Sequence, residues 1–212
     1  MAERYPERLA GLDPAGFLLP PARRRLCLLT GQSSFTSSAL PADKLRFLNA
    51  VAPADVLVTP AGFPWHAALT GAFAAPGLLP ACLRNARQWR WARRHEGFRG
   101  ALSAILELAL KRTEDRLLVV TGSCGVELLA QALSRLPTGG PALWAAVLGP
   151  AGRVPSARHV ARLLVIQGRR DVWSRMLWQG PVHRQPDCGH LEYYRDDDTI
   201  AAASAFFAGS AP

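Results

Sequence analysis

Short apolar runs recur along the chain, and segments with helical spacing separate them. The runs are rich in Val, Leu, Ile and Ala, are too short for a helix, and do not alternate with polar residues. Such runs are typical of strands that are buried on both faces. The predicted strands are residues 26–29, 55–58, 117–120, 142–148, 163–166 and 181–184, and 16–19 could add an edge strand.

Apolar residues three and four positions apart mark the helices between these runs. The clearest case is 101–110, where Leu102, Ile105, Leu106 and Leu110 share one side. Strands that alternate with helices indicate a parallel sheet with helices on both faces. The pattern therefore predicts an α/β protein, a three-layer sandwich with a mostly parallel sheet of about six strands. The other predicted helices cover 41–51, 126–133 and 199–207.

Residues 63–98 interrupt this pattern. Gly and Pro recur in the first half of the segment, and the basic run 84–95 follows with Trp89, Arg90 and Trp91 at its centre. The simplest interpretation is a surface helix that buries its Trp side and solvates its Arg side. A second is a lid or substrate entrance, in which the tryptophans meet an acyl chain and the arginines an anionic carrier. Interleaved Trp and Arg can also stack on nucleic acid, the least favoured of the three.

Length and charge narrow the class of protein. A chain of 212 residues that is 49% hydrophobic is expected to form one domain, residues 1–212. The net charge of +9 is carried almost wholly by arginine, which prefers phosphates and carboxylates, so an acidic partner is one explanation. A compositional bias that replaces Lys by Arg throughout is the other.

Location and redox state follow from what the sequence does not contain. No apolar run approaches the roughly 20 residues that cross a bilayer, and the first residues do not resemble a secretory signal. The four cysteines have neither CxxC pairing nor metal-ligand spacing, and Cys27 is expected to be a buried thiol. We therefore expect a cytoplasmic protein without disulfides, metal or cofactor. The oligomeric state does not follow from the sequence.

A five-residue turn, Thr121 to Gly125, joins the strand 117–120 to the helix 126–133. So short a connection needs small side chains on both sides of its apex, Ser123. Thr121 and Gly125 stand two residues before and after Ser123, the small-x-nucleophile-x-small pattern of a nucleophile elbow. An ordinary Gly-rich turn would have the same sequence pattern, so residues elsewhere in the chain must decide between a nucleophile elbow and a simple turn.

Two further residues follow predicted strands farther along the chain. Asp171 comes just after the strand 163–166, in the segment QGRRD, and His190 lies in a CGH segment before the last helix. With Ser123 they stand in the order serine, acid, histidine, which resembles the α/β-hydrolase fold superfamily and differs from trypsin-like and subtilisin-like orders. The resemblance runs from Leu26 to Phe207. It implies a reduced α/β-hydrolase fold.

The resemblance also implies the role of each residue. Ser123 would be the nucleophile, His190 the base that takes its proton, and Asp171 the acid that orients the imidazole. The developing oxyanion would be held by backbone amides. By similarity these belong to Cys124, directly after the nucleophile, and to Gln32, in the Thr-Gly-Gln loop after the first strand.

Each of these roles has an alternative in the sequence. Cys124 could be the nucleophile, but β-branched Val126 would then stand two residues after it and fits a tight turn badly. Asp187 could be the acid, but it lies only three residues before His190. Ser123 and Asp171 are therefore preferred. Of the other histidines, His183 is expected to pack beside a strand, and His66, His95 and His159 are expected on the surface.

The chain also departs from the family pattern. Thr121 replaces the usual first Gly of the elbow, and little chain separates Ser123 from Asp171, so any lid must come from residues 63–98. The expected activity is hydrolysis of a carboxylic ester or acyl thioester through an acyl-enzyme. The acyl group could be carried on coenzyme A or an acyl carrier protein, and no nucleic acid partner is expected. A non-catalytic binding protein of the same fold and an acyltransferase with the same triad are the alternatives.

Overall fold

A sheet of five parallel strands forms the centre of the computed structural model, which describes residues 5–71 and 77–211. All neighbouring strands are parallel, and helices lie in three of the four crossover connections; residues 149–161, which join the last two strands, contain no helix. The predicted α/β class is therefore confirmed. From one edge of the sheet to the other the strands are β2 (Leu57–Gly62), β1 (Ala22–Thr30), β3 (Thr113–Gly122), β4 (Ala142–Leu148) and β5 (Arg162–Ile166).

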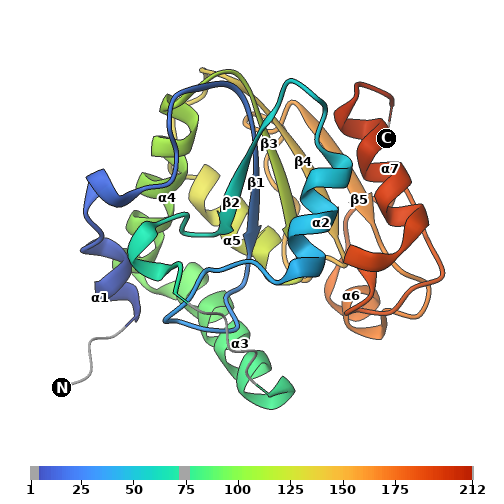
Figure 1. Cartoon of the computed structure of the whole chain (residues 1–212). Coiled ribbons are helices and arrows are strands. Elements are labelled where there is room, and N and C mark those ends of the chain that lie inside the picture. The colour runs from blue at the N-terminus through green and yellow to red at the C-terminus, as the bar shows by residue number, and fades with distance from the viewer. Residues whose placement is uncertain (1–4, 72–76, 212) are drawn as a thin grey trace.

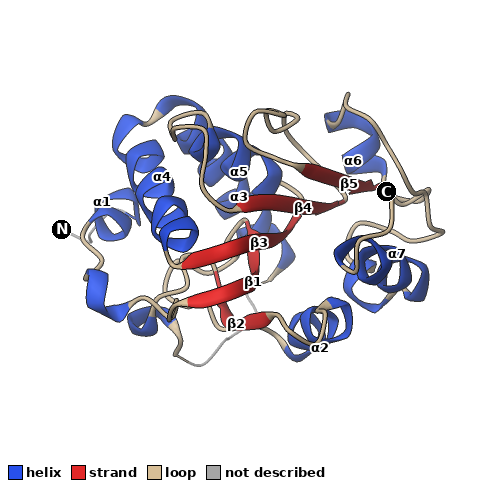
Figure 2. Ribbon diagram, turned by 90° about the horizontal axis from the view of Figure 1, so that it is seen from above, coloured by secondary structure: helices blue, strands red, loops and turns tan. Residues whose placement is uncertain are grey.

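Helices cover both faces of the sheet (Figures 1 and 2). The short helix α6 (Val172–Leu177) lies beyond the end of β5. No helix in the described part of the chain is long and apolar enough to cross a bilayer. One face carries α1 (Tyr5–Ala10), α3 (Leu78–Arg94), α4 (Glu96–Lys111) and α5 (Gly125–Leu133), and the other carries α2 (Ala42–Val51) and α7 (Asp197–Phe207).

Alternating side chains of each central strand belong to two separate apolar clusters. In β3, Leu117 and Val119 pack under α4 and α5, whereas Leu118 and Val120 pack under α2 and α7. Successive strand side chains point to opposite faces, so a strand covered on both sides must be apolar at every position. This is why the strands read as unbroken apolar runs.

The sheet has five strands in the described residues, and the prediction of about six was wrong at its outer edge. Residues 181–184 make only an isolated bridge, between Arg184 and Ile166. Beside it the imidazole Nδ1 of His183 accepts the Val165 N–H at 3.0 Å, so a side chain takes the place of a strand partner. Residues 16–19 likewise contribute a single bridge, from Phe17 to His66.

The register of the sheet brings the carboxyl ends of four strands to one edge. Thr30 pairs with Gly122, Gly122 with Leu148, and Leu148 with Ile166. The loops that follow these residues therefore emerge side by side. The chain also passes from β1 first to β2 on one side and later to β3 on the other, and ligands bind at such a switch point in open α/β sheets.

Gly125, the first residue of α5, lets that helix approach the sheet closely. A Cβ atom there would lie 2.5 Å from the Leu29 carbonyl oxygen and 2.7 Å from Thr121 Oγ1. Both distances are below van der Waals contact and most of the neighbours are backbone. The small residue two places after Ser123 is thus required by helix–strand packing.

We predict that Gly125→Ala lowers the free energy of unfolding by about 1–3 kcal/mol, because the added methyl group has no space. The matched control is Gly100→Ala in α4, where a Cβ atom would meet nothing within 4 Å. That change should raise stability by about 0.5–1 kcal/mol through helix propensity. Urea unfolding of the two variants measures both effects, and equal stabilities would contradict the packing argument.

Candidate active site

Ser123 stands at the apex of the turn between β3 and α5 with a φ angle of +50°. This left-handed conformation is unfavourable for a non-glycine residue and persists only where the surroundings enforce it. Here the Ser123 N–H donates to the Leu148 carbonyl at 3.1 Å, and its carbonyl accepts from the Ala151 N–H at 3.1 Å. The end of β4 therefore holds the strained serine in place.

The structure brings Ser123, Asp171 and His190 together from three loops. His190 Nε2 lies 3.1 Å from Ser123 Oγ, and His190 Nδ1 lies 2.8 Å from Asp171 Oδ2. Asp171 is fully buried, whereas His190 is about a quarter exposed. The three side chains form a continuous hydrogen-bonded chain from a buried carboxylate to a hydroxyl near the surface.

The Asp171 carboxylate accepts two further hydrogen bonds. The Ser174 amide donates to Oδ1 at 2.9 Å, and the Tyr193 hydroxyl donates to Oδ2 at 2.7 Å. Burial raises the pKa of Asp171, but the hydrogen bonds from His190, Ser174 and Tyr193 outweigh it, and the pKa lies below its ordinary value. Gly149 makes room for this arrangement, since a Cβ atom there would lie 2.6 Å from Asp171 Oδ2.

Tyr193 is a site residue that the sequence analysis did not identify. Besides its bond to Asp171, its hydroxyl accepts the Gly168 N–H at 2.8 Å. The tyrosine thus connects the acid, the loop before it and the short 3-10 helix after His190. Its position three residues after His190 could have suggested a neighbour of the histidine, but no spacing rule relates it to Asp171.

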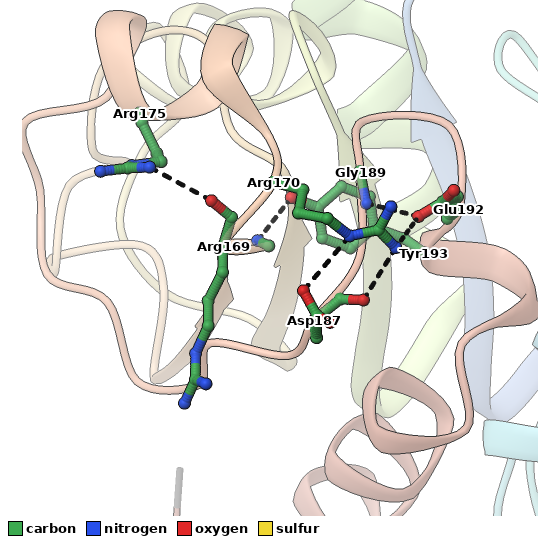
Figure 3. Close-up of polar contacts among 8 residues, drawn as sticks. Arg169, Arg170, Arg175, Asp187, Gly189, Glu192 and Tyr193 are labelled. Atoms are coloured by element: carbon green, nitrogen blue, oxygen red, sulfur yellow. Dashed lines mark hydrogen bonds and ion pairs between the residues drawn. The ribbon is translucent and has the colours of Figure 1, made fainter.

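Arg170 connects the loop that carries the acid to the loop that carries the histidine (Figure 3). Its guanidinium lies 3.2 Å from Asp187 Oδ1 and 2.8 Å from Glu192 Oε2, on either side of His190. Glu192 also accepts the Gly189 N–H at 2.6 Å. Asp187, the alternative acid, is thus an exposed partner of Arg170, and the carboxylate at the imidazole belongs to Asp171.

Cys124 lies beside the apex, but its thiol is buried. Burial raises the pKa of the Cys124 thiol to about 12, so it stays protonated at neutral pH. The sulfur is packed against Gly31, where a Cβ atom would lie only 2.3 Å from it.

Gln32 lies in the loop after β1, and its amide is already engaged. The Gln32 N–H donates to Gln88 Oε1 at 3.0 Å, and Gln88 Nε2 returns a bond to the Gln32 carbonyl at 2.7 Å. Gln88 is fully buried in α3, and Arg84 of the same helix donates to the Ser33 carbonyl at 2.7 Å. Helix α3 therefore holds the loop where the sequence places the second oxyanion donor.

The remaining predicted substrate residues lie along α3. Trp91 packs in an aromatic cluster with Tyr5, Phe35 and Phe98, and Trp89 lies beneath the Arg93 guanidinium at 4.4 Å. Arg90 is exposed. None of the three hydrogen-bonds a triad residue in the described part of the chain, and residues 72–76 of the predicted lid segment lie outside it.

The other histidines have structural contacts. His66, expected on the surface, is buried because its ring bonds the Asp13 carbonyl at 2.8 Å and the Ala68 N–H at 3.2 Å. The His95 ring accepts the Phe98 N–H at 3.1 Å and so caps the start of α4. Within residues 5–71 and 77–211, no group of three or more His, Cys, Asp or Glu side chains is arranged to hold a metal ion.

We predict that Tyr193→Phe lowers the free energy of unfolding at neutral pH by about 1.5–3 kcal/mol, because a buried carboxylate loses one donor. A carboxyl with a lowered pKa stabilises the fold above its unfolded pKa of 3.8, and this contribution is lost as the pH falls through the folded value. The variant should therefore lose stability at a higher pH than the wild type during acid titration.

Tyr194→Phe is the matched control for this prediction. Tyr194 is the adjacent tyrosine, and its hydroxyl makes no hydrogen bond among the described residues. Its removal should change the free energy of unfolding by less than about 0.5 kcal/mol. A Tyr193→Phe protein as stable as this control at every pH would contradict the role assigned to the hydroxyl.

Comparisons with known proteins find a similar fold but do not assign this chain to a family. No protein-family model matches the sequence, and no curated protein matches it. Among solved structures, the crystal structure of esterase PE8 is similar, with a TM-score of 0.50 and 16% sequence identity over 91% of this chain and 95% of that one. The relationship is thus a distant one, at the level of the α/β fold alone.

Proposed function

We propose that this chain is a serine hydrolase that cleaves a carboxylic ester or acyl thioester through an acyl-enzyme on Ser123. The observation that carries the proposal is the unbroken hydrogen-bonded chain from Ser123 Oγ through His190 to Asp171, with bonds of 3.1 and 2.8 Å. The strained backbone at the serine supports it, because strain of this kind gathers at functional sites. The fold shared with an esterase agrees with this class of reaction.

Each side chain has one task in the proposed reaction. His190 Nε2 takes the Ser123 proton as Oγ attacks the acyl carbon, and then delivers it to the leaving group. Asp171 keeps the second imidazole nitrogen protonated and stabilises the imidazolium. Water then attacks the acyl carbon: His190 Nε2 takes a proton from the water and delivers it to Ser123 Oγ as the acyl–Oγ bond breaks. The lowered pKa of Asp171 keeps the carboxylate charged at neutral pH.

Backbone amides supply the proposed oxyanion hole. The Cys124 amide lies at the start of α5, next to the nucleophile, where the helix dipole favours negative charge. The Gln32 amide could serve as the second donor only after Gln88 Oε1 gives up its place. Gln88 belongs to α3, so the second donor depends on the position of that helix.

Fluorophosphonate labelling tests the nucleophile. We predict that the wild type is labelled, that Ser123→Ala abolishes labelling, and that Cys124→Ala retains most of it, because the buried thiol is protonated. A folded wild type that is never labelled would remove the hydrolase proposal. Labelling lost in Cys124→Ala and kept in Ser123→Ala would transfer the role to the cysteine.

Hydrolysis of p-nitrophenyl esters and acyl-coenzyme A thioesters tests the acid. We predict that Asp171→Asn lowers kcat by about 10⁴-fold, as in other triads, because the imidazole loses its orientation and tautomer. Asp187→Asn, the matched control at the exposed partner of Arg170, should cost less than about tenfold. Comparable losses in the two variants would contradict the assignment of Asp171.

A further inference from the structure

Helix α6 presents its apolar side chains to solvent. Trp173 is 64% exposed and Met176 is 68% exposed, and Val172 and Leu177 are also largely open. Ser174 is the buried residue of this helix, since its amide bonds Asp171 and its hydroxyl accepts from Gln167 Nε2 at 3.1 Å. The usual arrangement of a surface helix, apolar side inward, is reversed here.

A second group of exposed apolar residues forms the first turns of α3. Leu78, Leu79 and Leu83 are all more than half exposed. Leu79 and Leu83 lie four residues apart and continue, at helical spacing, into the exposed arginines Arg87 and Arg90. One side of α3 therefore carries exposed leucines in its first turns and exposed arginines in the turns that follow.

Both apolar groups border the edge of the sheet that carries the triad. Asp171 is the N-cap of α6, and α3 holds the loop after β1 through Gln88 and Arg84. Figure 1 shows the start of α3 and helix α6 at the same, lower end of the molecule. Leu191, next to His190, is exposed as well.

Positive charge lies beside each apolar group. The Arg169 guanidinium extends away from its neighbours in Figure 3, and the Arg175 guanidinium donates to the Arg169 carbonyl at 3.2 Å. Among the described residues, neither of these arginines, nor Arg87 or Arg90, has a carboxylate partner. The nearby acidic residues Asp187 and Glu192 are already paired with Arg170.

We propose that this end of the molecule docks on an anionic lipid surface, with the start of α3 and helix α6 as its two apolar contacts. Leu83 and Arg87 are four residues apart, which places the Cα atom of the arginine about 6 Å behind that of the leucine along the helix axis. Apolar faces of interfacial helices enter a bilayer to a depth of ~5–10 Å. The arginines would then lie at the level of the lipid phosphates.

A lipid surface suits these contacts better than a folded acidic protein. The apolar side chains protrude from two separate helices, and each is flanked by arginine. A rigid partner would need two matching recesses, whereas a fluid interface accommodates any protruding shape. A tryptophan among arginines is also the composition expected at the boundary of headgroups and acyl chains.

Combined with the proposed function, on which this step rests, the docking names a substrate class. Ser123 would face the surface on which the protein sits, so an ester of a membrane lipid could enter the site without crossing water. Docking itself needs no catalysis and can be measured on the Ser123→Ala protein. Failure to bind lipid and failure to hydrolyse esters are therefore separate results.

The test is flotation of Ser123→Ala protein with vesicles of phosphatidylcholine alone or of equal parts phosphatidylcholine and phosphatidylglycerol. We expect binding to the anionic vesicles that weakens as salt is added. Trp173→Ser with Met176→Ser, and Leu79→Ser with Leu83→Ser, should each weaken it by about tenfold or more. Arg87→Gln with Arg90→Gln should weaken it by roughly fivefold for each charge.

Leu57→Ser is the matched control, because Leu57 is an exposed leucine at the start of β2, the opposite end of the sheet. It should float like the parent protein. Flotation that is absent with anionic vesicles, or equal for the control and the paired variants, would overturn the proposal. Two other results would also overturn it. One is a parent protein that is dimeric while the paired variants are monomeric, and the other is a parent protein that binds an acidic carrier protein in the absence of vesicles while the paired variants do not.

Turnover of a soluble p-nitrophenyl ester completes the design. With the serine restored, the paired Trp173 and Met176 variant should hydrolyse the soluble ester at the parent rate while losing activity on vesicle-borne esters. Equal loss on both substrates would show that the substitutions damage the site, and would count against docking.

Discussion

A buried carboxylate with its full set of donors is the interaction on which the candidate site depends. Asp171 has no exposure to water, so its charge must be balanced by groups of the protein. The imidazole of His190, the Tyr193 hydroxyl and the Ser174 amide supply this balance. They belong to two segments, helix α6 and residues 190–193, and the need to satisfy one charge therefore fixes the positions of these segments relative to each other.

The same carboxylate links the site to the surface. Its bond to the Ser174 amide places the first turn of α6, and burial of Ser174 forces the apolar residues of that short helix outward. The exposure of Trp173 and Met176 is thus a consequence of how the acid is held. Arg170 adds an outer connection between the acid and histidine loops, although both its partners are exposed and each ion pair contributes little by itself.

On the other side of Ser123, helix α3 links the candidate site to the surface as α6 does. Gln88 makes two hydrogen bonds with the backbone of Gln32, and Arg84 bonds the next residue. The loop that would complete an oxyanion hole is therefore attached to the helix whose beginning carries the exposed leucines. The start of α3, proposed to contact lipid, and Gln88, which occupies the Gln32 amide, therefore belong to the same helix.

The sequence by itself determined the parallel α/β class, because apolar runs are a local property. The order of Ser123, Asp171 and His190, each after a predicted strand, resembled that of α/β-hydrolases and so pointed to the three residues that meet at one edge. It also favoured Ser123 over Cys124, through the bulk of Val126. The tertiary structure decided the rest. Pairing across the sheet left residues 181–184 as a single bridge, burial made Tyr193 a partner of Asp171, and Gln88 occupied the Gln32 amide. These outcomes depend on residues distant in the chain that fill a particular space or satisfy a particular charge, and no local pattern encodes such contacts.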